Sequence, residues 1–367
     1  MTALPPDAQR YLGRMRSLEP PVELVDSIMA EVEATPQVRS GSDLRAMSTF
    51  VLAAAAVLLA IAVLLRIGAQ DVGPAPTPVP LDQLPSAGSV QARISIEASD
   101  VPAAFGHEFL WLTNATTGEL VRMDPANGSI ASPLQVTRAG GEVAIAISES
   151  SVWVADRRDA TVVELDPATL EERRRIPVTA TVSAVATLGA DLWLLDTGAG
   201  QLVRFDTADA GAALTVPVDG PSALLIHDGA VWVADELGEL VRIDPASGDE
   251  TGRVDLGFAV MRLVPDGGSL LAVGGAADLV ARIDVGSMRV SARGVRAPAI
   301  AVEGGRVWAV TASGYLVSLD PATLQPLAAS ALELDASGTL AFGGGLLWTT
   351  GVDAAGDAYL LKVVPQP

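Results

Sequence analysis

The chain has 367 residues, of which 49% are hydrophobic, a formal net charge of -20 and no cysteine. The hydrophobic content can bury a large core, and the lack of cysteine excludes disulfides, thiolate metal sites, thiol catalysis and iron–sulfur clusters. Such acidity repels a phosphate backbone, and Lys362 is the only lysine, so nucleic acid is not an expected partner.

Residues 1–45 predict a short helical segment in the cytoplasm. Within them, residues 5–34 contain two short helices, the second opened by Pro20 and Pro21 at first-turn positions. An apolar stripe follows at helical spacing, formed by Val22, Val25, Ile28, Met29 and Val32. So small a segment cannot bury this stripe alone, so it either docks on a cytoplasmic partner or stays partly unfolded.

Residues 46–67 predict a single transmembrane helix. The stretch 46–65, AMSTFVLAAAAVLLAIAVLL, carries no charge, and a helix of that length spans a hydrocarbon core of about 30 Å. A cleaved signal peptide is the alternative, but a long segment precedes the apolar run and no clear A-x-A site follows it. More arginines flank the apolar run on its N-terminal side than on its C-terminal side. Five precede it, at Arg10, Arg14, Arg16, Arg39 and Arg45, whereas only Arg66 lies close after it. This bias predicts a cell-membrane protein with a cytoplasmic N-terminus and an extracytoplasmic C-terminal part.

Residues 68–90 predict a linker, because the stretch VGPAPTPVPLDQLPSAG is rich in Pro and Gly and favours an extended spacer.

From residue 91 to residue 367 one unit recurs about every forty residues, a spacing typical of propeller blades. Each unit has a small apolar run, a Gly or Asp turn, a V-W-V run, and then L-V-R-I-D with a P-A-S/T-G turn. The seven copies are anchored on Trp111, Trp153, Trp193, Trp232, Leu271, Trp308 and Trp348.

The predicted fold is therefore an all-β, seven-bladed β-propeller. The seventh copy stops after its third strand, and a lone strand, ARISIE at 92–97, precedes the first copy, so the N-terminal strand should close the last blade. The aspartates of the Asp-Pro-Ala turns, Asp124, Asp166, Asp244 and Asp320, are interpreted as turn formers. Copy five, with Leu271 for Trp and DVGSM at the turn, is either a loosened blade or sequence drift.

Candidate ligand-binding residues lie on the face formed by the second-to-third-strand loops and the blade junctions, which we call the loop face. Asp156, Asp196 and Asp235 each stand three residues after their tryptophan and predict a partial carboxylate ring for a divalent cation or a basic partner. The alternative is that each aspartate only ends its strand and stabilises a tight turn. No motif for a metal site is recognisable among them.

Arg262 also departs from the repeat pattern. Nine residues before the anchors the other copies have small side chains, at Pro102, Ala144, Ala184, Ala223, Ala299 and Thr339. If this strand lines the central channel, Arg262 offers a cation for a carboxylate or phosphate. The alternative is an arginine that is hydrated in the channel or paired with an aspartate.

The units VWVAD and LVRIDPASG resemble the repeats of YVTN and NHL-like propellers, streptogramin lyase included, over residues 91–367. The lyase resemblance implies a histidine acid/base site with a nearby metal. This chain has only His107 and His227, both in turns between first and second strands, away from the loop face. The layout of a helical tail, one span and an external domain also resembles membrane-bound anti-sigma factors, although their His-x3-Cys-x2-Cys motif is missing.

These observations predict a membrane-anchored extracytoplasmic module that binds or scaffolds a protein or small ligand, with no cofactor and no recognisable catalytic residue. Two alternatives remain, a propeller enzyme of the lyase or lactonase type and the sensor domain of an anti-sigma-like regulator. A cluster of acid/base or metal-ligating groups on one face would distinguish the enzyme.

Overall fold

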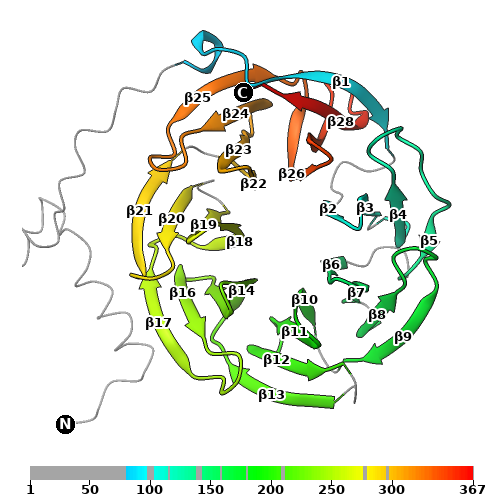
Figure 1. Cartoon of the computed structure of the whole chain (residues 1–367), viewed down its shortest axis with the longest axis vertical. Helices are drawn as coiled ribbons and strands as arrows, with labels where there is room; N and C mark the ends of the chain where they lie inside the picture. The colour runs from blue at the N-terminus through cyan, green and yellow to red at the C-terminus, as the bar shows by residue number, and fades with distance from the viewer. Residues whose placement is uncertain are drawn as a thin grey trace, which may run out of the picture. The chain divides into compact units, whose positions relative to one another are not determined.

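A computed structural model of the chain describes residues 80–96, 103–114, 116–137, 143–157, 159–178, 181–207, 211–275, 279–294 and 297–366, which belong to the compact unit Pro78–Pro367. These residues form seven four-stranded antiparallel sheets arranged as blades around an axis (Figure 1). The predicted all-β, seven-bladed propeller is therefore confirmed. The predicted segments 1–45 and 46–67 lie outside the described residues, within which no helix is long and apolar enough to cross a membrane.

Each blade runs from an innermost first strand to an outermost fourth strand. Blade 1 comprises β2 (Ala103–Gly106), β3 (Phe109–Asn114), β4 (Glu119–Met123) and β5 (Leu134–Gln135). Blade 2 comprises β6 (Val143–Ile147), β7 (Val152–Asp156), β8 (Thr161–Leu165) and β9 (Glu172–Pro177). Blade 3 comprises β10 (Val182–Leu188), β11 (Asp191–Asp196), β12 (Gln201–Asp206) and β13 (Gly211–Pro217).

The remaining blades follow the same order. Blade 4 comprises β14 (Pro221–His227), β15 (Ala230–Asp235), β16 (Glu239–Ile243) and β17 (Glu250–Asp255). Blade 5 comprises β18 (Val260–Asp266), β19 (Ser269–Gly274), β20 (Val280–Asp284) and β21 (Arg289–Gly294). Blade 6 comprises β22 (Ala299–Glu303), β23 (Arg306–Val310), β24 (Tyr315–Leu319) and β25 (Pro326–Ala331). Blade 7 comprises β26 (Asp335–Gly343), β27 (Leu346–Val352), β28 (Ala358–Pro365) and, from the other end of the chain, β1 (Gly88–Ser95).

The V-W-V run forms the second strand of the blade, and the burial of that strand explains why the run is apolar. In β7 and β15 every residue is buried, because the strand has neighbours on both edges and a packed blade on both faces. A strand with only one packed face would instead alternate buried and exposed residues. Blade 5 keeps four strands, and its Leu271 is fully buried in the tryptophan position, so copy five is not a loosened blade.

The hydrophobic core is divided among the seams between blades. Buried side chains of the described residues form seven clusters, and each cluster joins two neighbouring blades. One of them joins Trp348 and Leu360 of blade 7 to Leu110 and Met123 of blade 1, so the seam that closes the ring also has an apolar core. A propeller with an apolar cluster at every seam is a rigid platform for its loops.

In blades 1, 3 and 7 the basic residue at the arginine position of the L-V-R-I-D run links one blade to the next. Arg204 lies over the Trp193 ring, 5.9 Å from its centroid, and its Nη1 donates to the Pro245 carbonyl in the turn of blade 4, at 2.7 Å. Lys362 lies over Trp348 in the same way and donates to the Pro125 carbonyl of blade 1, at 2.9 Å. We call this contact the clasp, and in blade 7 it spans the closure seam.

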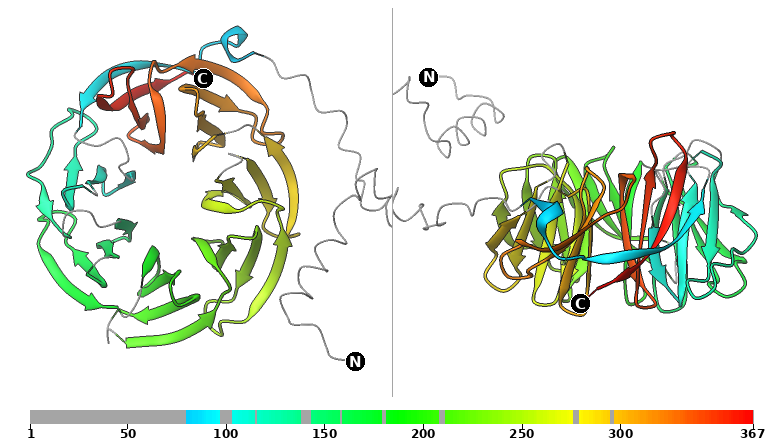
Figure 2. Two further views of the ribbon diagram at one scale, coloured as in Figure 1. Left: turned by 180° about the vertical axis from the view of Figure 1, so that it is seen from behind. Right: turned by 90° about the horizontal axis from the view of Figure 1, so that it is seen from above.

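Ring closure occurs as predicted, through the N-terminal strand. β1 pairs antiparallel with β28 from Gly88↔Pro365 to Ser95↔Tyr359 and forms the outer edge of blade 7. The domain begins earlier than the predicted boundary at residue 91, because residues 81–88 follow the outer strand of blade 6 (Figure 2). There the Pro85 carbonyl accepts the Ala329 N–H at 2.8 Å, and Ser330 Oγ accepts the N–H groups of residues 87 and 88. We call residues 81–88, which include the 3-10 helix η1 (Leu81–Gln83), the strap.

Candidate functional site

The three predicted carboxylates lie at the loop face, each at the end of a second strand and almost fully buried. Asp235 Oδ1 accepts the N–H groups of Leu237 and Glu239, both at 2.8 Å. Asp196 Oδ1 accepts the Ala199 N–H at 2.9 Å, and Asp156 Oδ1 accepts the Asp159 N–H at 3.2 Å. Each carboxylate therefore holds the turn that follows its own strand.

Two further blades have the same local device with a different residue. Asn114 Oδ1 accepts the N–H groups of Thr116 and Thr117, and Thr311 Oγ1 accepts the Tyr315 N–H at 3.1 Å. Within the described residues, no group of three or more His, Asp or Glu side chains is placed to hold a metal ion. The structure thus places the predicted aspartates at equivalent positions without gathering them into one metal-binding group.

Arg262 lies on β18, the innermost strand of blade 5, opposite Val273 of β19. It is half-buried, and the residue before it, Met261, is 70% exposed. The expected channel ring of small side chains is not formed, because Ala223 and Ala299 are buried in clusters between blades. Side chains of an inner strand point sideways toward neighbouring blades, so the strand edge, not the alanines, faces the axis.

Met261 is exposed because it occupies a bulge. The first strands of blades 3, 4 and 5 share a register shift at the residue after their first position. Blades 3 and 4 have serine there, and Ser183 Oγ and Ser222 Oγ donate to the Leu195 and Ala234 carbonyls of the second strand. In blade 5 the long apolar side chain of Met261 extends over Gly275, where an added Cβ would come within 2.7 Å of its sulfur.

Two exposed apolar side chains, Leu237 and Met261, thus lie on the loop face near Arg262 and are connected through the half-buried Phe258; we call these three residues the loop-face patch. Leu237 is 52% exposed in the second-to-third-strand loop of blade 4. Phe258 packs between the two blades, with its backbone against Gly238 and its ring against Gly274. Sequence reasoning missed this loop-face patch, although the change from serine to methionine directly before Arg262 is a readable signal.

The two histidines lie at the opposite face, and each contacts the first-to-second-strand turn of the following blade. His107 Nε2 lies 2.9 Å from the Ser148 carbonyl of blade 2, and His227 Nε2 lies 2.7 Å from the Gly267 carbonyl of blade 5. The φ angle of His107 is 51°, so it also occupies a left-handed turn position. Both histidines therefore join the turns of neighbouring blades.

Comparison with known proteins identifies the fold only. No protein-family model matches the chain, and no curated protein matches it either. Among solved structures, the β-propeller domain of Cps50 (Swd1) from Myceliophteria thermophila aligns with a TM-score of 0.62 at 13% identity, covering 73% of this chain and 99% of that one. The computationally designed protein Ika8 aligns with a TM-score of 0.56 at 14% identity, covering 73% of this chain and 98% of that one.

Proposed function

We propose that the propeller is a binding module that takes a protein partner on the loop face at blades 4 and 5. The observation that carries this proposal is the apolar loop-face patch of Leu237, Phe258 and Met261 beside the half-buried Arg262. Exposed apolar groups next to an arginine favour a partner segment in which an apolar side chain adjoins a carboxylate. A closed ring presents such a surface without having to order it on binding.

A peptide-display library panned against the immobilised full-length chain tests this binding. We expect enrichment of peptides with a large apolar residue next to Asp or Glu. Their affinity should fall about tenfold or more for Met261→Ser and for Arg262→Ala, since each change removes one of the two recognition elements. Met261→Ser places the serine of blades 3 and 4 at the same bulge, so its melting temperature should not fall.

The matched control is Leu327→Ser, which removes another exposed apolar side chain, on β25 at the outer wall of blade 6. This variant should bind the peptides like the unaltered chain. The proposal fails if no such peptides are enriched, or if Leu327→Ser weakens binding as much as Met261→Ser does.

We propose further that residues 46–67 hold this module on the extracytoplasmic side of the cell membrane, with residues 5–34 available to a cytoplasmic partner. The uncharged run from residue 46 to residue 65 and the arginines before it support this arrangement. In cell fractionation the full chain should stay with membranes after a high-salt wash, and Ala55→Asp together with Leu58→Arg should release it. Protease added to intact spheroplasts should digest the propeller but not residues 1–45, and the reverse pattern would overturn the orientation.

A further inference from the structure

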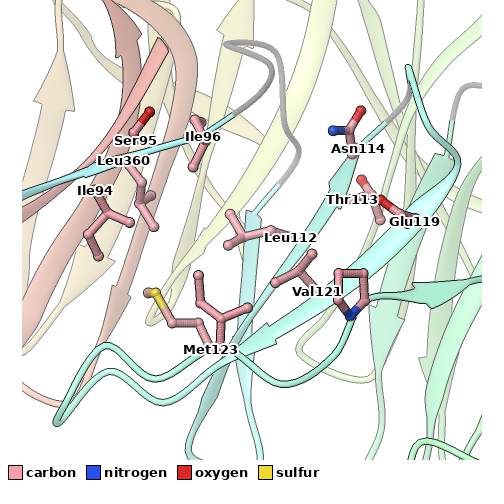
Figure 3. A pocket seen from close by; sticks show the side chains of 12 residues that line it. Ile94, Ser95, Ile96, Leu112, Thr113, Asn114, Glu119, Val121, Met123 and Leu360 are labelled. Atoms are coloured by element: carbon pink, nitrogen blue, oxygen red, sulfur yellow. The ribbon is translucent and has the colours of Figure 1, made fainter.

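A cavity of about 230 Å³ lies at the closure seam, between blade 7 and blade 1. Ile94 and Ile96, at and just after the end of β1, form one wall, and Leu112, Val121 and Met123 of blade 1 form another (Figure 3). Glu119 lies toward one end, next to Asn114. The cavity is therefore mostly apolar, with a carboxylate at one end, and we call it the seam cavity.

The seam cavity lies where blade 1 lacks an arginine that four of the other blades have. Nine residues after the turn aspartate, blades 2, 4 and 5 carry Arg175, Arg253 and Arg293 on their outer strands, and Arg93 has the equivalent pairing in blade 7. Blade 1 has Pro133 at this place. Proline cannot donate to the ladder, and the outer strand β5 is reduced to Leu134–Gln135.

In blades 2, 4, 5 and 7 this arginine bonds either a carboxylate or the junction with the preceding blade, whereas blades 3 and 6 have Thr215 and Ala329 at the equivalent pairing. Arg253 bonds Glu239 through Nη1 and Glu250 through Nη2, the latter at 2.7 Å. Arg293 Nη1 donates to the Leu256 carbonyl at 2.9 Å. Arg93 Nη2 donates to the Leu332 carbonyl and to Glu333 Oε2, at 3.1 and 3.0 Å.

Glu119 is the blade 1 counterpart of Glu239, since both begin the third strand of their blades. Its Oε2 accepts a hydrogen bond from Thr117 Oγ1 at 2.9 Å. No ion pair to Glu119 occurs among the described residues, and Ile130 replaces the second carboxylate, Glu250, of the blade 4 network. The carboxylate is thus retained where its arginine partner is replaced by apolar walls.

We propose that the seam cavity binds a small organic cation, whose ammonium group pairs with Glu119 and whose apolar body packs between Ile96, Val121 and Met123. An apolar cavity of 150 Å³ holds a benzene molecule, so this one fits a ligand of about ten non-hydrogen atoms. The ligand supplies both parts of what an arginine supplies in the other blades, a charged head and an apolar stem. This site lies between blades 7 and 1, apart from the loop-face patch of blades 4 and 5, and goes beyond the function proposed above.

Calorimetric titration of the full-length chain with 2-phenylethylamine tests the proposal, with 2-phenylethanol and phenylacetate as uncharged and anionic probes of similar size. The amine should bind roughly 10- to 100-fold more tightly than the alcohol, because a hydrogen bond to a charged group is the stronger one. Phenylacetate should bind most weakly. Glu119→Gln should remove the advantage of the amine over the alcohol.

Two further variants separate binding from folding. Glu239→Gln changes the matched carboxylate of blade 4 and should leave the affinity for the amine unchanged. Pro133→Arg places the arginine of the other blades beside Glu119, so it should abolish binding of the amine without lowering the melting temperature. Met261→Ser, at the loop face, should bind the amine normally, so failure of the partner proposal does not affect this one.

Several results would overturn the proposal. It fails if the amine does not bind, if the alcohol binds equally well, or if Glu239→Gln weakens binding as much as Glu119→Gln. Should Glu119→Gln fail to fold, Pro133→Arg decides, and an unchanged affinity in that variant rejects the seam cavity as the site.

Discussion

At the scale of single residues, the clasp is a contact between two blades, so it cannot be recognised within one repeat. Its stem covers a tryptophan of its own blade, and its charge ends on a carbonyl of the following blade. In blade 2 Glu164 stands in its place, and Arg174 of the outer strand takes over by pairing with Glu164 and reaching the Thr207 carbonyl of blade 3. A cation between the aromatic ring of one blade and the turn of the next therefore recurs by two different routes.

Lys362→Met tests the clasp at the closure seam. The variant keeps an apolar stem over Trp348 but loses the charge and the hydrogen bond to the Pro125 carbonyl, so the free energy of unfolding should fall by about 1–2 kcal/mol. Denaturant unfolding followed by tryptophan fluorescence measures this change. Arg242→Met is the control, because Arg242 lies over Trp232 but makes no clasp bond within the described residues, and it should cost less. Equal losses would mean that the hydrogen bond contributes nothing.

The turn aspartates predict a pH dependence. Backbone N–H bonds from Thr169 and Ala168, together with Arg173, lower the pKa of Asp166 from 3.8 to about 2. The pKa values of Asp244, Asp284 and Asp320 are lowered mainly by hydrogen bonds within their own turns. Because these pKa values are lower in the folded than in the unfolded chain, their stabilising contribution is complete above the unfolded value and is lost as pH falls toward 2.

The melting temperature should therefore decline progressively between pH 5 and pH 2. In Asp166→Asn the decline should be shallower, since one titrating group has been removed, while the melting temperature at pH 7 should be lower than in the unaltered chain. Differential scanning calorimetry across this range checks both expectations. A melting temperature that stays constant from pH 5 to pH 3 would contradict them.

At the scale of strands and loops, repeat spacing was sufficient to predict the blades and their closure, because each unit encodes four strands and the ends of the chain hold complementary parts of one blade. The contacts between units were not predictable in the same way. The strap depends on Leu81 and Leu84 meeting blade 6, and the seam cavity on Pro133 interrupting an outer strand. Both follow from how blades pack, which no single repeat records. The ring carboxylates likewise share a repeat position, but each turns into its own loop.

Gly88→Ala tests how closely β1 fits against β28. A Cβ at residue 88 would come within 2.7 Å of the Val364 carbonyl oxygen, a backbone atom that cannot easily move. We expect the free energy of unfolding to fall by about 1–3 kcal/mol, the usual cost of overpacking. Gly211→Ala is the matched control on the outer strand of blade 3, because nothing lies within 4 Å of its added Cβ. Similar melting temperatures for the two variants would show that the closing strand adjusts freely.

At the scale of the whole propeller, one apolar cluster per seam makes each blade depend on two neighbours. β1 covers the edge of β28 that would otherwise present unpaired backbone groups. A chain that begins at residue 80 should remain monomeric and unfold in one transition. A chain that begins at residue 97 should associate through the uncovered edge of β28. Size-exclusion chromatography with light scattering distinguishes these cases, and a monomeric shorter chain would contradict the closing role of β1.

The strap also determines how tension would enter the molecule. A pull applied before Pro80 reaches the outer wall of blade 6 first, where the bonds around Ser330 and the Pro85 carbonyl would have to separate one after another. Only then would the load arrive at the ladder between β1 and β28, whose length along the strand shares the force among several bonds at once. The strap would therefore detach from blade 6 before β1 separates from β28 and the ring opens.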